Sequence, residues 1–228
     1  MNGRRALITG ASRGVGAAIA RAFATRGARV ALLSRSGDDL GIGLGIACDV
    51  TDRDAVFAAT AQAVDAFGGL DCVVANAGVG MYGSFVDMDP AHVEAMIDVN
   101  LKGTLYTAAA TLPHLIAAGG GDFVSLASVA GLRAFPGEAV YNASKFGQVG
   151  FTRALDHELR EHGVRATNVA PGGIATEFAM GTGREEGSTE GMLSAEDVAE
   201  QVVFCVTRPP GMRILTMSSR PMNEGSWG

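Results

Sequence analysis

The chain has 228 residues, of which 47% are hydrophobic and 18% are charged, and its formal net charge is −6 at pH 7. This length favours one domain over residues 1–228 with a sizeable core. The acidic balance without a basic block argues against nucleic acid or an anionic membrane surface as a partner. No apolar run of about 18 residues and no signal-peptide pattern occurs, so we expect a cytoplasmic protein without a membrane span.

Strand-like and helix-like patterns alternate along the chain, which predicts a parallel sheet with helices on both faces. The expected strands span residues 5–9, 29–33, 45–48, 71–75, 123–127, 165–169 and 213–217. The expected helices span residues 14–26, 53–67, 91–118, 138–162 and 195–207. The prediction is a doubly wound α/β sheet of about seven parallel strands in three layers.

The first expected strand leads through a glycine-rich turn into a helix pattern. The turn reads Thr9-Gly10-Ala11-Ser12-Arg13-Gly14-Val15-Gly16. Glycines permit a tight turn and a close ligand, and the free N–H groups at a helix start attract an anion, so this arrangement is typical of a dinucleotide pyrophosphate site. Its Gly-x-x-x-Gly-x-Gly spacing differs from the usual Gly-x-Gly-x-x-Gly, and a turn without a ligand is the alternative.

The connection between the second and third expected strands is short and rich in glycine. A crossover with a full helix needs at least about 10–12 residues, so we expect a loop or a single turn over residues 35–44. This connection would leave the adenine side of a bound dinucleotide more open than usual.

The end of the second expected strand indicates which dinucleotide binds. It carries Ser34 and Arg35 and no acid. Arginine can pair with the 2′-phosphate of NADP, whereas a carboxylate there would favour NAD. Together with Arg13 of the glycine turn, Arg35 predicts a preference for NADP(H). Asp38 and Asp39 could oppose this preference, and a solvated Arg35 is the alternative.

Tyr141 and Lys145 are four residues apart on an expected helix and therefore share one face. Ser128 follows the strand pattern that precedes this helix. A phenol titrates near about 10, and a nearby cation lowers its pKa toward neutrality. The three side chains could move a proton to or from a carbonyl oxygen. A solvated Tyr-x-x-x-Lys pair is the alternative.

Taken together, these motifs resemble those of the short-chain dehydrogenase/reductase family over about residues 4–176. The resemblance implies a Rossmann-type fold and assigns the glycine turn to the cofactor. It also implies a catalytic tetrad of Asn100, Ser128, Tyr141 and Lys145. Further cofactor contacts are implied at Asp49 and Val50, at Asn76-Ala77-Gly78, at Tyr141 and Lys145, and at Pro171, Gly172, Ile174 and Thr176.

The resemblance also implies individual roles. Asp49 would meet the adenine amino group, with capping of the next helix as its alternative. Asn100 would kink a long helix and anchor a proton-relaying water, whereas an isolated Asn in a helix is more often solvated. For Asn76 the alternative is a turn former. Ser128 would bind the substrate oxygen, and Lys145 would hold the nicotinamide ribose.

The implied activity is NADP(H)-dependent hydride transfer between the nicotinamide and a small-molecule carbonyl or secondary alcohol. The alternatives are a catalytically silent NADP(H)-binding sensor or scaffold, and an NAD-dependent alcohol dehydrogenase. The two long helix patterns resemble the family's oligomer-forming pair, so we expect a homodimer or homotetramer.

Further expectations concern the substrate side and the thiols. The glycine-rich segment 177–193, which includes Gly187, is expected to be a mobile substrate loop. Candidate lining residues of an apolar pocket are Ala130, Leu132, Phe135, Gly173 and Met180, for which core or hinge positions are the equal alternative. The histidines and cysteines lack metal-ligand spacing, so we expect no metal site. Cys48, Cys72 and Cys205 are expected to be buried thiols.

Overall fold

Parallel strands form a single continuous sheet in the computed structural model, which describes residues 1–183 and 189–225. Within these residues the sheet has seven strands in the order β3-β2-β1-β4-β5-β6-β7. Their bounds are β1 (Arg5–Thr9), β2 (Arg29–Ser34), β3 (Leu44–Ala47), β4 (Cys72–Ala75), β5 (Gly121–Leu126), β6 (Val164–Pro171) and β7 (Thr216–Ser219). The predicted doubly wound α/β fold is confirmed.

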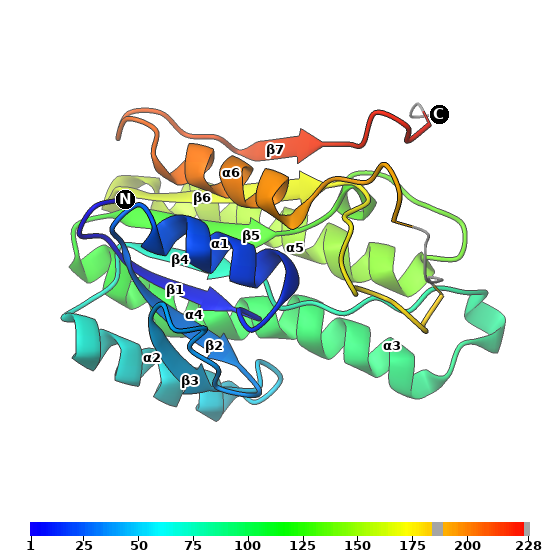
Figure 1. Ribbon diagram of the computed structural model, residues 1–228, viewed down its shortest axis with the longest axis horizontal. Helices are drawn as coiled ribbons and strands as arrows, with labels where there is room; N and C mark the ends of the chain where they lie inside the picture. Colours follow the sequence, from blue (N-terminus) through cyan, green and yellow to red (C-terminus); the bar gives the residue numbers. More distant parts are fainter. Residues whose placement is uncertain (184–188, 226–228) are drawn as a thin grey trace.

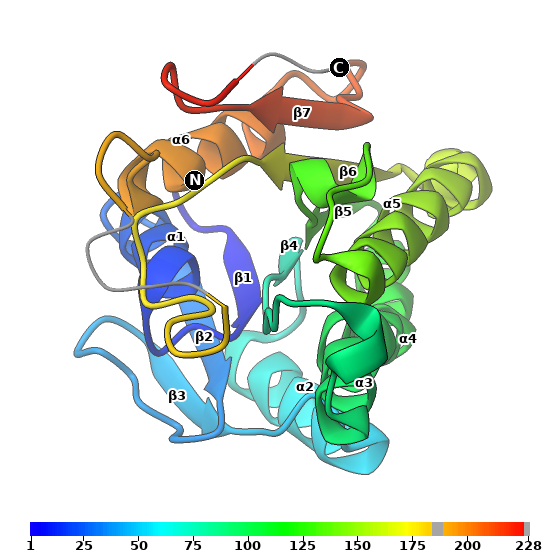
Figure 2. The ribbon, with the colours of Figure 1, turned by 90° about the vertical axis from the view of Figure 1, so that its right-hand side faces the viewer.

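Helices cover both faces of this sheet, as Figures 1 and 2 show. The helices are α1 (Gly14–Ala24), α2 (Arg53–Phe67), α3 (Pro90–Met96), α4 (Gly103–Ala117), α5 (Ala139–Leu159) and α6 (Ala195–Val206). One core cluster joins α1 and α6 to the sheet, and a second joins α2, α4 and α5 to the opposite face. The central strands are apolar on both faces for this reason; all four residues of β4 are buried.

Local signals explain why α2 has the predicted bounds. The carboxylate of Asp52 accepts hydrogen bonds from the N–H groups of Asp54 and Ala55 at 2.9 and 3.0 Å, which caps the helix start. Gly68 ends the helix with a left-handed conformation at φ +77°, which glycine adopts without strain.

The single helix expected over residues 91–118 is divided in the structure. The chain stays helical, but η2 (Ile97–Lys102) is a π-helical segment between α3 and α4. Such wide turns interrupt the regular i to i−4 ladder and bring additional residues to the inner face. The shorter 3₁₀ segments η1 (Phe85–Asp87), η3 (Val129–Gly131) and η4 (Arg160–His162) lie between regular elements.

The predicted start of the last strand, which was expected over residues 213–217, was wrong. The ladder with β6 begins where Asn168 pairs with Thr216, and β7 ends at Ser219. Arg213 instead turns toward α5, where it forms an ion pair with Asp156. The adjacent apolar residues Ile214 and Leu215 gave a strand pattern to this segment, and the carbonyl of Leu215 accepts the N–H of Asn168 at 3.1 Å just before the ladder begins.

The connection over residues 35–44 contains turns and no helix, as predicted. It lies close against the sheet edge, because a Cβ on Gly43 would lie 2.3 Å from the carbonyl oxygen of Val30. Leu40 and Ile42 pack their partly buried side chains against the core.

The three cysteines are free and buried, as predicted. Burial raises the pKa of the Cys48 and Cys205 thiols to about 11 and that of Cys72 to about 12. No helix among the described residues is long and apolar enough to cross a membrane.

Candidate active site

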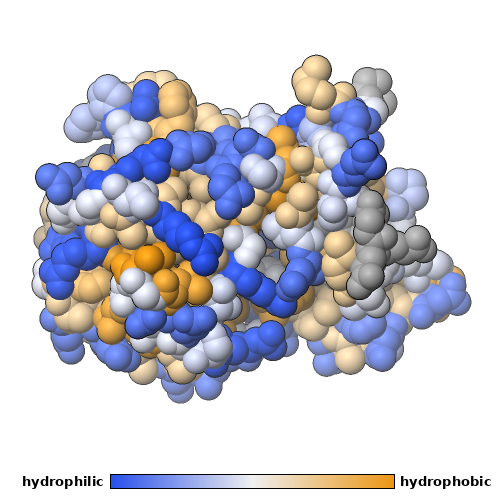
Figure 3. All heavy atoms as spheres, in the orientation of Figure 1, coloured by the Kyte–Doolittle hydropathy of each residue, from blue (hydrophilic) through white to orange (hydrophobic). Residues whose placement is uncertain are grey.

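All the predicted site residues lie at one edge of the sheet. The strands are parallel, so the segments after β1 to β6 emerge together at their carboxyl ends. The strand order reverses between β1 and β4, because β2 and β3 lie on one side of β1 and β4 to β7 lie on the other. Such a switch point is where ligands bind in open α/β sheets. The space-filling view is hollowed at this edge, between the sheet and the segment after β6 (Figure 3).

The glycine turn after β1 approaches the loop after β4 too closely for larger residues. Gly10 has φ +65°, and a Cβ on Gly16 would lie 2.3 Å from the carbonyl oxygen of Gly10. The Nδ2 group of Asn76 donates to the carbonyl oxygens of Thr9 and Gly10 at 2.8 and 3.1 Å. Asn76 therefore braces the glycine turn, a role beyond the turn former considered as its alternative.

Thr9 also links the glycine turn to the loop after β4, and it was not among the predicted site residues. Its Oγ1 accepts the backbone N–H groups of Asn76 and Ala77 at 3.0 and 3.1 Å. The sequence placed Thr9 at the end of a strand and at the start of the glycine turn, without a role for its side chain. The one signal in the sequence for this role was a hydroxyl-bearing residue directly before the first glycine of the turn.

The start of α1 fits an anionic ligand. Asp52, Asp89 and Ser194 cap α2, α3 and α6 with side-chain oxygens, but α1 has no side-chain cap and no acid in its first turn. Its first N–H groups are thus available to a phosphate, with the favourable end of the helix dipole behind them. Together with the closely packed glycines, this geometry fits the pyrophosphate of a dinucleotide.

The two arginines predicted to read the 2′-phosphate have different surroundings. Arg35 is exposed, forms no ion pair with a described residue, and lies near Asp49, whose pKa it helps to lower after the hydrogen bonds from Thr51. Arg13 is exposed and pairs with Glu177 at 3.0 Å. A phosphate would therefore compete with Glu177 for an ion pair with Arg13, whereas at Arg35 no ion pair with a described residue would have to break.

Neighbouring polar residues are held by the backbone. Ser34 is buried, and its Oγ accepts the N–H of Gly37 at 3.1 Å, so it shapes the turn after β2. Asp38 and Asp39 accept the N–H groups of Leu40 and Gly41 at 2.9 and 2.8 Å. These carboxylates cap turns and form no ion pair with Arg35. Val50 is buried beside Gly103 at the start of α4.

Asn100 is fully buried, so the solvated alternative is wrong. It lies in the π segment η2, and its Oδ1 accepts the N–H of Val79 at 2.8 Å. Its Nδ2 donates to the carbonyl of Val79 at 2.9 Å and to Oγ of Ser144 at 3.0 Å. Asn100 thus ties the loop after β4 to α5, close to Gly78.

Lys145 has its ammonium group in the interior. Only 3% of the residue is exposed, and Nζ donates to the carbonyl of Leu126 at 3.1 Å. Burial disfavours the charged form and lowers the pKa of Lys145 to about 7. The amine can therefore take up and give back a proton near neutral pH.

Tyr141 and Ser128 lie at the same edge of the sheet as the amine of Lys145. Nζ of Lys145 is 5.6 Å from the centre of the Tyr141 ring. Ser128 follows β5, and its Oγ accepts the N–H of Ala130 at 3.1 Å, which orients the hydroxyl at the start of η3. A phenol, an amine of lowered pKa and an oriented hydroxyl form a group that can exchange a proton with a substrate oxygen.

Two aromatic rings that the sequence did not indicate pack against Tyr141. Tyr82 meets it edge-on with ring centres 5.6 Å apart, and Phe178 is tilted at 5.9 Å. Ala130 and Phe135 of the predicted apolar pocket belong to the same cluster. Tyr141 is consequently only 6% exposed. Position in the sequence could not reveal Tyr82 and Phe178, because both come from irregular segments.

The segment after β6 returns to the glycine turn. Pro171 ends β6, and the N–H of Gly172 donates to the carbonyl of Ser219 at 2.8 Å. Ile174 forms a bridge with Leu193. Thr176 reaches the glycine turn, since a Cβ on Gly14 would lie 3.7 Å from its Cγ2. This brings the predicted nicotinamide-side residues beside the start of α1.

Part of the expected loop 177–193 can be described. The carbonyl of Thr182 accepts the N–H of Tyr82 at 2.8 Å, and Oγ1 of Thr182 donates to the carbonyl of Gly80 at 2.8 Å. Gly187 lies outside the described residues, and the mobility of the loop stays a prediction. No group of metal-ligating side chains occurs within 1–183 and 189–225.

Comparisons with known proteins agree with this geometry. A family model described as short chain dehydrogenase matches residues 4–187. An uncharacterized oxidoreductase of Staphylococcus epidermidis is 33% identical and aligns over 95% of this chain and 96% of its own. The structure of an alcohol dehydrogenase from the archaeon Thermococcus sibiricus, complexed with 5-hydroxy-NADP, has a TM-score of 0.90 at 29% identity over 99% of both chains. A short chain dehydrogenase from Burkholderia cenocepacia in complex with NADP has a TM-score of 0.85 at 31% identity, covering 95% of this chain and 96% of its own.

The lowered pKa of Lys145 predicts how stability depends on pH. Above about pH 7 the unfolded chain binds a proton at Lys145 that the folded chain does not, so the free energy of unfolding should rise with pH. One such proton adds up to about 1.4 kcal/mol per pH unit, and the rise is best followed below about pH 8.5, where cysteines begin to titrate. Lys145→Met removes the titrating group and should flatten the rise.

Urea unfolding at a series of pH values measures this effect. The matched control is Lys102→Met, because the chain has two lysines and Lys102 is exposed on η2. The control should keep the pH dependence of the natural chain. An equal slope in the Lys145→Met protein would contradict a pKa near 7 for the buried amine.

Proposed function

Because the chain belongs to the short-chain dehydrogenase family, we propose that it is an NADP(H)-dependent oxidoreductase acting on a carbonyl compound or a secondary alcohol. The observation that carries the proposal is the placement of Tyr141, buried Lys145 and Ser128 beside an uncapped, glycine-led helix start. Bound NADP(H) would supply or accept the hydride. The residues of the chain would handle the proton.

Tyr141 would donate its hydroxyl proton to the substrate oxygen during reduction and recover it during oxidation. Lys145 favours the phenolate whenever it is protonated, and its lowered pKa lets it return a proton at neutral pH. Ser128 would hydrogen-bond the same substrate oxygen and stabilise the charge that develops on it. Asn100 would act on Lys145 indirectly, because it fixes α5 and the loop after β4 relative to each other.

The choice of NADP(H) has two supports. The T. sibiricus and B. cenocepacia structures are complexes with an NADP derivative and with NADP. In this chain the exposed Arg35 follows directly after β2, where no acid precedes it in sequence, and its guanidinium suits a 2′-phosphate. The bond between Arg13 and Glu177 lessens the contribution of Arg13, so Arg35 carries most of the discrimination.

The second candidate function is a cofactor-binding sensor without turnover. The aromatic cover over Tyr141 favours it, since Tyr82 and Phe178 leave little of the phenol exposed. Parallel titration with NADPH and NADH, followed by a screen of ketones, aldehydes and 3-keto esters, separates the possibilities. Tight NADPH binding without turnover on any carbonyl would favour the sensor, and tighter NADH binding would favour the NAD-dependent alternative.

Removal of one hydroxyl tests the role of Tyr141. Tyr141→Phe should lower kcat by at least about a hundredfold, because general acid–base catalysis contributes about that much or more. The Kd for NADPH should change little. Tyr106→Phe is the matched control and should keep full activity, since Tyr106 lies on α4 and packs against a different core cluster from Tyr141. Comparable activity in both variants would remove Tyr141 as the acid.

Arg35→Ala tests which side chain reads the 2′-phosphate. One charge-assisted hydrogen bond is worth about 1.5–3 kcal/mol, so the Kd for NADPH should rise at least about tenfold while that for NADH stays nearly constant. Equilibrium titration of both cofactors gives the ratio. Arg160→Ala alters an exposed arginine of η4 and should leave both affinities unchanged. An equal loss for NADPH and NADH would show that Arg35 does not contact the phosphate.

We extend the proposal to assembly through α4 and α5. Both helices expose a large apolar residue, Ile116 on α4 and Phe146 on α5, which a partner copy would cover. Sedimentation of the purified protein should give a dimer or tetramer. A monomer at micromolar concentration would exclude this interface.

A further inference from the structure

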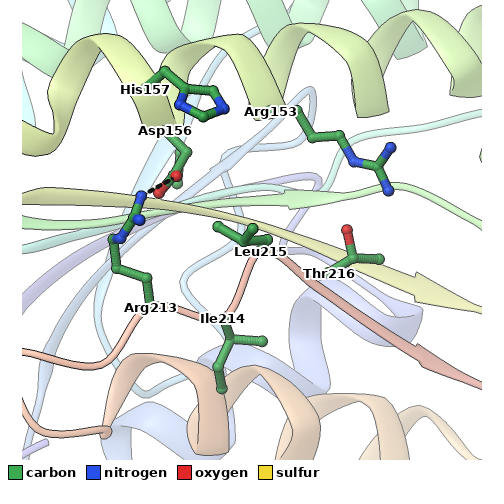
Figure 4. A pocket seen from close by; sticks show the side chains of 8 residues that line it. Arg153, Asp156, His157, Arg213, Ile214, Leu215 and Thr216 are labelled. Carbon is green, nitrogen blue, oxygen red and sulfur yellow. Dashed lines mark hydrogen bonds and ion pairs between the residues drawn. The ribbon is translucent and has the colours of Figure 1, made fainter.

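A pocket of about 530 Å³ opens between α5 and the segment that enters β7 (Figure 4). Its walls carry three basic side chains and one acid, which are Arg153, His157, Arg213 and Asp156. None of the predicted site residues lines it. Asp156 follows Lys145 on the same helix by eleven residues, or about 16 Å along the axis. The pocket is therefore separate from the candidate active site.

Arg153 is the cation that the fold leaves available in this pocket. It is exposed and forms no ion pair within residues 1–183 and 189–225. Arg213 is paired with Asp156, whose side chain is only 3% exposed, so this acid neutralises Arg213 from the buried side. The charge of Arg153 remains, and His157 adds another whenever it is protonated. The pocket thus attracts an anion, although the net charge of the chain is −6.

A second pocket shows what a cationic site looks like when the fold uses its arginines. It has a volume of about 470 Å³, and Arg4 and Arg165 line it. Both arginines pair with the buried Asp122, at 2.6 and 2.8 Å. Nη1 of Arg4 also donates to the carbonyl of Val206 at 2.7 Å, and Arg165 donates to several carbonyls. These guanidinium groups hold the fold together, whereas that of Arg153 has no such task.

The floor of the Arg153 pocket is apolar. Ala166, Ile214 and Leu215 contribute to its lining. Leu215 is 48% exposed, and in Figure 4 it lies between the guanidinium groups of Arg153 and Arg213. An alkyl chain laid over Leu215 would remove apolar surface from water. The pocket therefore offers a cation and an adjoining apolar surface to the same ligand.

The wall that carries Leu215 is held in place before any ligand arrives. The ion pair with Asp156 orients Arg213. The carbonyl of Leu215 accepts the N–H of Asn168 at 3.1 Å, and the carbonyl of Met212 accepts Nη1 of Arg165 at 3.1 Å. A ligand would meet a preformed surface, which lowers the cost of ordering on binding.

We propose that this pocket binds an aliphatic carboxylate whose head group pairs with Arg153 and whose chain lies on Leu215. A guanidinium presents two parallel N–H groups that match the two oxygens of a carboxylate. A phosphate ester would bring a second negative charge close to Asp156, so the single charge of a carboxylate suits the pocket better. The proposal goes beyond the proposed function, because binding requires neither cofactor nor turnover.

Titration calorimetry of the full chain in its own assembly tests the need for a negative charge. The probe is octanoate, and octan-1-ol and octylamine have the same chain without that charge. Octanoate should bind saturably and at least about tenfold more tightly than either, since a charge-assisted hydrogen bond contributes a factor of this size. No octanoate binding, or equal affinity for the three compounds, would overturn the proposal.

Arg153→Gln locates the head group. The substitution alters an exposed side chain, so folding should be preserved, and the Kd for octanoate should rise at least about tenfold. Arg21→Gln is the matched control, because it removes an exposed arginine from α1 on the opposite face of the sheet and should leave the Kd unchanged. Full affinity in Arg153→Gln would place the carboxylate elsewhere, the candidate active site included, and would overturn the proposal.

Chain length locates the tail. From butanoate through hexanoate to octanoate, the Kd should fall by about twofold to fourfold for each methylene, since a fully buried methylene contributes about fourfold. Leu215→Ser alters a partly exposed side chain and should flatten this dependence. Equal affinity for the three acids would indicate an adventitious anion only and overturn the proposal. Binding that depends on Arg153, in a protein without turnover on any carbonyl, would support this site while counting against the proposed function.

Discussion

Hydrogen bonds between Thr9 and the loop after β4 hold the two halves of the sheet together where they meet. One hydroxyl accepts two backbone N–H groups, and Asn76 returns two hydrogen bonds to the glycine turn. These four hydrogen bonds fix the uncapped start of α1 relative to the loop after β4, which Asn100 links to α5. The helix start that fits a pyrophosphate and the proposed catalytic group are therefore parts of one connected hydrogen-bonded framework, which is the preorganisation that the proposed catalysis would require.

The burial of Lys145 is the second constraint, and it explains the surroundings of that residue. An isolated ammonium in an apolar interior is costly, and the chain lowers the pKa of the group to about 7 in place of a carboxylate partner. A neutral amine tolerates a single carbonyl acceptor at Leu126.

Local signals in the sequence predicted much of the fold and of the site, and long-range packing accounts for the remainder. Both predicted ends of α2 match the structure, where the Asp52 cap and Gly68 are local signals that lie next to the helix in sequence. Burial of Asn100 could not be foreseen, because its partners Val79 and Ser144 are distant in the sequence and a π segment has no pattern of its own. The predicted start of β7 was wrong for a related reason, because Arg213 forms an ion pair with Asp156 on a different element. Polar residues at every fourth position of α5 would ordinarily indicate a solvated face, yet Ser144, Gln148, Thr152 and Asp156 are buried.

The reactivity of the three buried cysteines can report local opening of the structure. A thiol reacts as its thiolate, and burial holds the pKa of Cys48, Cys72 and Cys205 at about 11, 12 and 11, so alkylating reagents and oxidants find little to attack in the closed state. Cys72 lies at the start of central β4, Cys205 on α6, and Cys48 just after β3 at the sheet edge. The alkylation rate of each thiol therefore reports how often its own region opens, from the margin of the sheet to its centre.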